Sequence, residues 1–359
     1  MRWRLRGADG VRLPHIVFAS VASSTLPSLT DHLKTRYCVE LLPLQNFARG
    51  PGIFGKLALS ISSLTQLTRL LLEPAARNPR TLLITDSCHY ACLLLAKLCS
   101  LVGSRKSVYL FNFYIHQMGT NFCVRRILAW LLRGDISIFA QSSKECAYFL
   151  KLSPTLNIRY FPYCRPPIEL VDSDAIRVGD YVFAGGYTNR DFETFISAAR
   201  SLPDIPFVLV SSRLNRITKT LPSNIQHFQD IPLRDFQNLL AGSRLLVIPL
   251  KDDVGSSGQM TALAGMQFSK TVVYPGFDVI AQYFENGLSG VQYRARSVES
   301  LRETIRELYS DAERLQAIGI RARQRWESAF AMNRFETALI NHVEHAIRRH
   351  VPLERDNGI

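Results

Sequence analysis

The chain has 359 residues, of which 47% are apolar and 20% charged, and its net charge is +13. This composition excludes an intrinsically disordered polypeptide, and the length favours two domains of about 150 to 200 residues. No apolar run reaches the roughly 18 residues of a membrane-spanning helix. The seven cysteines match neither a zinc site nor a disulfide framework, so no metal site is expected.

The positive charge lies in the first half of the chain. Residues 1–170 contain 21 Lys and Arg against 8 Asp and Glu, whereas residues 171–359 contain 22 of each class. This asymmetry indicates that one domain faces an anionic surface or substrate, with phospholipid, lipid diphosphate and nucleic acid as candidates. A solvated basic face without a partner is the alternative.

In chain order, the first half alternates short apolar runs with stretches of helical periodicity. The predicted strands are residues 15–19, 37–42, 81–86, 107–113 and 135–140, and the predicted helices are residues 26–33, 57–71, 90–101 and 123–132. Basic residues before the first strand imitate a signal peptide, but the apolar run is short and we interpret it as a strand. The alternation predicts a parallel sheet with helices on both faces.

Candidate catalytic groups follow two of these strands. Asp86 and His89 come after the third strand, and His116 comes after the fourth. Open parallel sheets bind their ligands at the carboxyl ends of the strands. An Asp or His at such a position can take a proton from a substrate hydroxyl. Because none has a partner at a fixed spacing, a structural role is the alternative for each.

The helix predicted at residues 123–132 combines arginines with apolar residues. Arg125, Arg126 and Arg133 flank an apolar run that contains Trp130. Such a helix can rest on a membrane surface with the indole at the interface. An ordinary amphipathic helix packed on the core is the alternative.

A proline-rich stretch at residues 161–167 follows a helix whose predicted N-cap is Ser142, with Glu145 three residues on. The charge balance changes just after this stretch, so we place the domain hinge there. The predicted organisation is an N-terminal domain over 1–165, a C-terminal domain over 166–330 and a helical segment over 331–359 that crosses back to the N-terminal domain. The apolar residues of that segment recur in four-residue steps: Phe335, Leu339, Val343 and Ile347.

Two glycine-containing loops in the second half have the composition of phosphate-binding loops. Gly185 and Gly186 follow an apolar strand and precede Arg190, whose guanidinium suits a diphosphate. Residues 255–261 follow another apolar strand and precede a helix, whose free N–H groups favour an anion. For this second loop, a plain Ser/Gly linker is the alternative.

Residues 180–335 resemble the nucleotide-binding half of a glycosyltransferase of the GT-B fold, most closely the family 4 type. The motifs that carry the resemblance are Phe183-Ala184-Gly185-Gly186 with Arg190, Ile248-Pro249-Leu250 before the loop, residues 264–273, which are similar to the family's EAMACGKPVV stretch, and Asn286-Gly287-Leu288-Ser289-Gly290, which matches its NGxxG turn. In the first half only the βα rhythm and the cap at Ser142 are similar. The resemblance implies an α/β protein with two Rossmann-like domains facing each other across a cleft.

The sequence departs from the family pattern at the donor site. Ser256 and Ala264 stand where the family has its paired glutamates. Gly186 stands where the family has a basic residue, and Arg190 stands where it has its lysine. The second glutamate usually holds the ribose of the nucleotide. The remaining donor-site residues are Gln259, as a candidate for the ribose together with backbone groups, and Ser256, Ser257, Gly258 and Thr261 for the diphosphate.

The resemblance implies transfer of a sugar, of hexose type and with retention of configuration, from a nucleotide diphosphate sugar to an acceptor hydroxyl. No cofactor or metal is expected, because Arg190 and the helix N-terminus at Gly258 would stabilise the departing diphosphate. A dehydrogenase is disfavoured, since no GxGxxG follows a strand with an acidic residue about 20 positions later. The alternative is a non-catalytic GT-B-like protein that senses a nucleotide or binds anions or a membrane.

The charge of the first half then has to be matched by the acceptor or its surroundings. Lipid diphosphates present negative charge beside an apolar tail, so we expect a lipid-linked acceptor and peripheral contact with an anionic membrane. The expected location is the cytoplasm, at the inner face of the plasma membrane, in assembly of a bacterial surface polysaccharide or glycolipid. Nucleic acid is not expected as a partner, because no interleaved aromatic and basic surface or recognition helix is evident.

Overall fold

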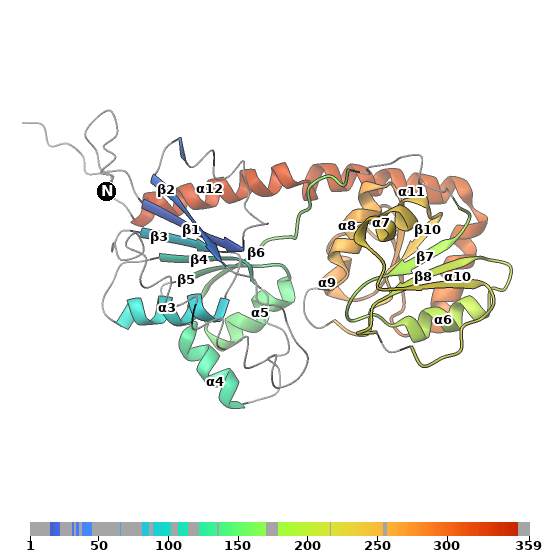
Figure 1. Ribbon diagram of the computed structural model, residues 1–359, viewed down its shortest axis with the longest axis horizontal. Helices are drawn as coiled ribbons and strands as arrows, with labels where there is room; N and C mark the ends of the chain where they lie inside the picture. Colours follow the sequence, from blue (N-terminus) through green and yellow to red (C-terminus); the bar gives the residue numbers. More distant parts are fainter. Residues whose placement is uncertain are drawn as a thin grey trace, which may run out of the picture. The chain divides into compact units, whose positions relative to one another are not determined.

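A computed structural model of the chain (Figure 1) describes residues 15–21, 31, 34–35, 38–44, 65, 81–85, 89–101, 107–113, 122–134, 136–169, 179–215, 217–253 and 257–350. The chain divides into two compact units. Unit 1 comprises Met1–Pro162 together with Phe335–Ile359, and unit 2 comprises Tyr163–Arg334. Among the described residues, no helix is both long and apolar enough to cross a bilayer.

Unit 1 contains a six-stranded sheet, and every pair of neighbouring strands in it is parallel. The strand order is β2-β1-β3-β4-β5-β6, and a described helix follows each of β3, β4 and β5. The strands are β1 (His15–Val21), β2 (Cys38–Leu44), β3 (Thr81–Thr85), β4 (Ser107–Phe113), β5 (Ile136–Ala140) and β6 (Asn157–Tyr160), and the helices are α3 (His89–Leu101), α4 (Phe122–Leu131) and α5 (Ser143–Leu152). Figure 1 shows α3, α4 and α5 together on one side of these strands. The predicted alternation is confirmed from β3 onward, whereas the helices predicted at residues 26–33 and 57–71 lie outside the described residues except at positions 31 and 65.

Two local predictions in unit 1 need correction. The sequence analysis placed no strand after α5, yet β6 pairs with β5 along the edge of the sheet. Most of β6 is exposed and Ile158 is its one aliphatic residue, so it lacks the alternation that marks a half-buried strand. Ser142 is the N-cap residue of α5, as predicted, but its side chain makes no capping hydrogen bond.

Unit 2 contains a second six-stranded parallel sheet, in the order β12-β11-β10-β7-β8-β9. The strands are β7 (Val182–Gly185), β8 (Phe207–Ser211), β9 (Ile225–Gln229), β10 (Leu245–Val247), β11 (Thr271–Pro275) and β12 (Val291–Tyr293), and the helices are α6 (Phe192–Arg200), α7 (Leu233–Gly242), α8 (Gln259–Gln267), α9 (Asp278–Ala281), α10 (Val298–Ser310) and α11 (Ala312–Arg325). Read from β9, the strands are the third, second, first, fourth, fifth and sixth of the unit. This is the doubly wound order of dinucleotide-binding folds.

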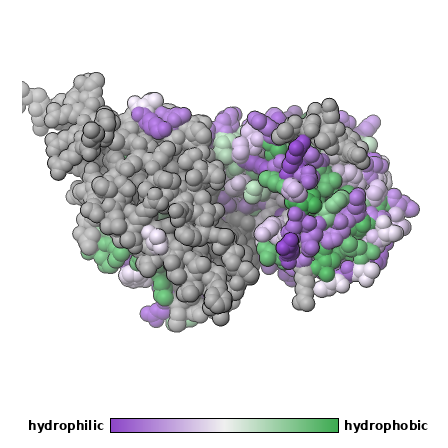
Figure 2. Space-filling model, viewed as in Figure 1, coloured by the Kyte–Doolittle hydropathy of each residue, from purple (hydrophilic) through white to green (hydrophobic). Residues whose placement is uncertain are grey.

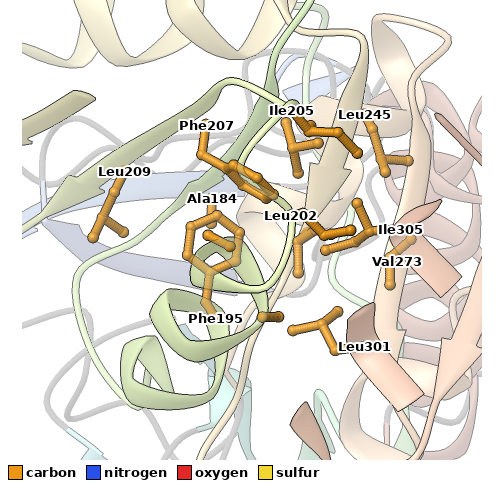
Figure 3. Close-up of a cluster of buried hydrophobic side chains, with 14 of the residues drawn as sticks. Ala184, Phe195, Leu202, Ile205, Phe207, Leu209, Leu245, Val273, Leu301 and Ile305 are labelled. Atoms are coloured by element: carbon orange, nitrogen blue, oxygen red, sulfur yellow. The ribbon is translucent and has the colours of Figure 1, made fainter. Parts of the chain in front are cut away.

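Alternation along the buried strands of unit 2 supplies a hydrophobic core on each face of the sheet. The side chain of Ala184 points to one face of the sheet and belongs to a hydrophobic cluster with residues of α6 and α10 (Figure 3). The side chain of its neighbour Phe183 points to the opposite face and belongs to a second cluster with residues of α8. One face of α6 is buried in the first of these clusters: Phe192, Phe195, Ile196 and Ala199. Burial on both faces fixes the register of the strands and therefore the positions at which their loops emerge.

The chain ends in α12 (Met332–His350), which follows a π-helical turn over Trp326–Phe330. From Phe335 onward, α12 is part of unit 1. Within the predicted stripe, Leu339 is fully buried. The side chains of Phe335, Val343 and Ile347 lie outside the described residues.

Gly319 provides a test of the packing in unit 2. It lies on α11 against the turn after α8, and a Cβ here would collide with the carbonyl group of Ser269. We expect Gly319→Ala to lower the free energy of unfolding by about 1 to 3 kcal/mol, because α11 must shift, although alanine is the better helix former. Urea denaturation measures this. Gln316→Ala, at an exposed position of the same helix, is the control, and equal stability of the two variants would contradict the packing.

Candidate functional site

The candidate site of unit 2 lies where the order of the strands reverses. β7 and β10 are neighbours in the sheet, and the chain runs outward from them in opposite directions. Open α/β sheets bind ligands at the carboxyl ends of the strands at such a point. The two glycine-containing loops of the sequence analysis follow β7 and β10, and therefore emerge side by side.

Backbone contacts hold the two loops together. Arg190 and Leu250 form an antiparallel β-bridge. The Asp191 N–H donates to the Pro249 carbonyl over 3.0 Å, and the Lys251 N–H donates to the Asn189 carbonyl over 3.3 Å. Backbone hydrogen bonds alone therefore fix the loop after β7 against the loop after β10.

The side chain of Arg190 lies inside this junction and is 5% exposed. Its Nε donates to the Gly185 carbonyl over 3.1 Å and its Nη1 donates to the Thr188 carbonyl over 2.8 Å. Nη2 lies 3.4 Å from the Thr261 Oγ1 and donates to it. These bonds use three of the five N–H groups of a guanidinium. Arg190 and Thr261, 71 positions apart, are therefore brought into one cluster.

The positive charge of Arg190 has no counter-ion among the described residues. The adjacent carboxylate, Asp191, instead accepts from the N–H and the hydroxyl of Thr194 and caps α6. Burial lowers the pKa of Arg190 to about 10, so the group is charged at neutral pH and its hydrogen bonds offset only part of the cost of desolvation. An anion bound at the junction would offset that cost.

Gly186 explains how a guanidinium fits so close to the chain. A Cβ at position 186 would overlap the Nε, Nη2 and Cζ atoms of Arg190, and the φ angle of Gly186 is +150°. Any residue with a side chain would therefore expel the guanidinium. The glycine at 186, where the family has a basic residue, leaves the space that the guanidinium of Arg190 occupies.

The loop after β10 leads into α8 through a left-handed glycine. Gly258 is the N-cap residue, with a φ of +84°, and no side chain caps the helix. The first intrahelical bond runs from the Ala262 N–H to the Gly258 carbonyl. Neither the Met260 nor the Thr261 N–H finds an acceptor in the described part of the chain. These groups and the helix dipole favour an anion here.

The other predicted donor-site residues divide by position. Ser257 and Gln259 are buried beside Gly258, at 8% and 5% exposure. Ser256 lies outside the described residues. Ala264, where the family has its second glutamate, is 1% exposed and packs in the hydrophobic cluster under α8. The side chain at position 264 therefore offers no polar contact.

The predicted catalytic residues are in unit 1. Asp86 and His116 lie outside the described residues. His89 is the first residue of α3, but its side chain is not described. Their assignment to proton transfer stays a prediction.

Two contacts of the site were missed by sequence reasoning. Arg165, from the proline-rich stretch, donates from Nη1 to the Met260 carbonyl in the first turn of α8, over 3.1 Å. Asn189 adopts a left-handed φ of 55° and donates from Nδ2 to the Asp252 carbonyl over 3.1 Å. An asparagine in a polar turn signals such a conformation, whereas the partner of Arg165 depends on tertiary structure alone.

No protein-family model matches the chain, and no curated protein matches it. Solved structures do match it over nearly its whole length. HepE of Anabaena in complex with UDP and glucose shares 13% identity, with 92% of this chain and 99% of that chain covered and a TM-score of 0.62. Sucrose-phosphate synthase of Thermosynechococcus elongatus shares 11%, with 93% and 99% covered and a TM-score of 0.68. The UDP-forming α,α-trehalose-phosphate synthase of Burkholderia vietnamiensis shares 11%, with 94% and 98% covered and a TM-score of 0.63.

These similarities show that the chain has the GT-B fold of glycosyltransferases. Each of the two units carries its own parallel sheet, as the resemblance implied. Identities this low establish the fold alone. The similarity to family 4 in particular stays a prediction.

The packing of Arg190 against Gly186 can be tested with an anion. We expect Gly186→Ala to displace the guanidinium and to weaken binding of inorganic pyrophosphate about tenfold, since one charge-assisted contact is misplaced. Isothermal titration calorimetry measures the affinity. Gly287→Ala is the matched control, because Gly287 has a φ of +79° but open space around its missing Cβ. Equal affinities in the two variants would refute the role of the Gly186 turn.

Proposed function

We propose that the protein is a glycosyltransferase that uses a nucleotide diphosphate sugar as donor. The observation that carries the proposal is the buried, uncompensated guanidinium of Arg190 beside the uncapped N-terminus of α8. Both lie at the carboxyl edge of the sheet, where the strand order reverses. The fold supports the same proposal, because structural neighbours such as HepE bind UDP-glucose.

In the proposed reaction, the bond between the anomeric carbon and the diphosphate oxygen breaks and a bond to the acceptor oxygen forms. The departing diphosphate takes the electron pair, and the acceptor proton passes to a base. Arg190 and the first-turn N–H groups of α8 would stabilise the charge that develops on the diphosphate, with no metal or other cofactor. Asp86, His89 and His116 are the proposed candidates for the base.

The ribose needs a contact other than the one the family obtains from its second glutamate. We assign it to Gln259, the first residue of α8, or to a backbone group of the loop that precedes it. The hydroxyls of Ser256, Ser257 and Thr261 would bind diphosphate oxygens. Thr261 is already oriented by Arg190, so these two residues would act on the diphosphate together.

The finer assignments belong to the same proposal. The enzyme would transfer a hexose with retention, to a lipid-linked acceptor, in assembly of a bacterial surface polysaccharide or glycolipid. It would work in the cytoplasm, in peripheral contact with the anionic inner face of the plasma membrane. The excess of Lys and Arg in residues 1–170 supports an anionic acceptor environment.

A screen of nucleotide sugars and free nucleotides tests the proposed function. A matching nucleotide diphosphate at about 100 times its dissociation constant should stabilise the protein by about 2.7 kcal/mol and raise its melting temperature by several degrees. Release of the nucleoside diphosphate in the presence of a lipid acceptor then tests catalysis. Stabilisation without any release would support the non-catalytic alternative, and no stabilisation by any nucleotide would refute the donor site.

Substitution of Arg190 tests the residue itself. We expect Arg190→Ala to weaken UDP binding by about 2 to 3 kcal/mol, or roughly 30- to 150-fold, because a charge-assisted contact is lost. Arg200→Ala is the matched control, since Arg200 ends the helix that Arg190 precedes and is exposed. Circular dichroism verifies folding. Unchanged UDP affinity in a folded Arg190→Ala protein would remove Arg190 from the donor site.

A further inference from the structure

Large apolar side chains are exposed on two neighbouring helices of unit 1. These side chains are Leu98 and Leu101 on α3, at 39% and 62% exposure, and Phe122, Ile127 and Trp130 on α4, at 69%, 59% and 44%. The helices pack together, and the Lys97 ammonium of α3 lies 5.4 Å from the centroid of the Trp130 ring. We call these five side chains, with Arg125, Arg126 and Arg133, the α3–α4 surface. Figure 2 shows hydrophobic and hydrophilic residues close together at the lower edge of unit 1, where Figure 1 places these helices.

The apolar residues of α4 lie on both sides of the helix, which separates this helix from an ordinary amphipathic one. Leu128 and Leu131 are buried at 2% and 8% exposure and attach α4 to the core of unit 1. On the exposed face, Phe122, Arg126 and Trp130 follow one another at four-residue steps. The Arg126 guanidinium lies 5.6 Å from the centroid of the Phe122 ring. One face of α4 therefore packs on the core, and the other leaves arginines and large apolar side chains exposed.

The chemistry of this surface matches an anionic lipid layer. No Asp or Glu occurs between Asp86 and Asp135, a stretch that contains six Lys and Arg. Arg125, Arg126 and Arg133 are exposed. Arginines can pair with lipid phosphates while Phe122 and Trp130 enter the region of the headgroups and upper acyl chains.

We propose that the α3–α4 surface docks unit 1 onto an anionic bilayer leaflet, with α4 lying in the plane of the interface. The proposal rests on the proposed function, because a lipid-linked acceptor is what would make docking useful. It names the surface that would meet the membrane. It also assigns distinct parts to the residues: arginines for attraction, and Phe122, Ile127 and Trp130 for insertion.

Sedimentation with vesicles tests the docking. The probes are vesicles of phosphatidylcholine alone and vesicles with about one-third phosphatidylglycerol, at about 0.05 M and 0.5 M salt. The full-length protein should partition onto the anionic vesicles at least about tenfold more strongly than onto the neutral ones at low salt, and should be released at high salt. Equal binding to both vesicles, or no binding at low salt, would overturn the proposal.

Paired substitutions identify the surface. Arg125→Gln with Arg126→Gln should reduce partitioning onto anionic vesicles by about tenfold or more, and Ile127→Ser should reduce it about threefold. The matched controls are Arg321→Gln and Ile320→Ser, both exposed on α11 of unit 2, and they should leave partitioning unchanged. Unchanged partitioning of the α4 variants would overturn the proposal. Tighter binding to DNA than to anionic vesicles would overturn the proposal in favour of a nucleic-acid partner. If ultracentrifugation shows that the unsubstituted protein is a dimer and the α4 variants are monomers, the surface is instead an interface between two copies of the chain.

The donor site provides an independent readout in the same samples. A UDP-induced rise in melting temperature reports on unit 2 and does not require a membrane. Loss of vesicle binding with an intact UDP response would overturn the docking alone. Vesicle binding without any nucleotide response would refute the proposed donor function and leave the docking supported.

Discussion

One buried cation constrains the carboxyl edge of the sheet in unit 2. The Arg190 guanidinium holds the carbonyls of Gly185 and Thr188 and reaches Thr261 on α8. The residue at 186 has to be glycine, because the guanidinium occupies the position of its side chain. The bridge between Arg190 and Leu250 fixes the distance between the loops. These hydrogen bonds offset part of the cost of keeping the charge out of water, and an anion at the junction would offset the rest, since no described carboxylate pairs with Arg190.

Much of the fold could be predicted because both sheets are parallel. Strands buried on two faces appear as compact apolar runs, as in Leu245–Val247 and Thr271–Pro275. β6 was not predicted because it is an edge strand without such an apolar run. It carries Asn157, Arg159 and Tyr160 around a single aliphatic residue. Its place in the sheet comes from pairing with β5 and from a bond between the Asn157 and Ser137 side chains. Neither is visible in the local sequence.

The local structure around the candidate site could be predicted in its parts but not in its assembly. The composition of each loop indicated a phosphate contact, and Gly258 is indeed the left-handed residue that begins α8. The family pattern, however, suggested a deficit at position 186, whereas the structure shows a replacement by Arg190. This exchange depends on a side chain that turns back over its own turn. Spacing alone does not reveal such a conformation, because several rotamers of a long side chain fit one backbone.

The arginine of the donor site and the arginines of α4 differ in their exposure to solvent, and this difference suits them to different roles. Arg190 is 5% exposed, so salt screens its attraction for an anion only weakly, and it can hold a diphosphate at physiological ionic strength. Arg125 and Arg126 are exposed, so their attraction for a charged surface decays within a Debye length of about 8 Å. The first is suited to hold one ligand in a fixed geometry, and the second to reversible contact with a fluid surface. The proposed function, with a donor from solution and an acceptor in a membrane, would use both, one in each unit.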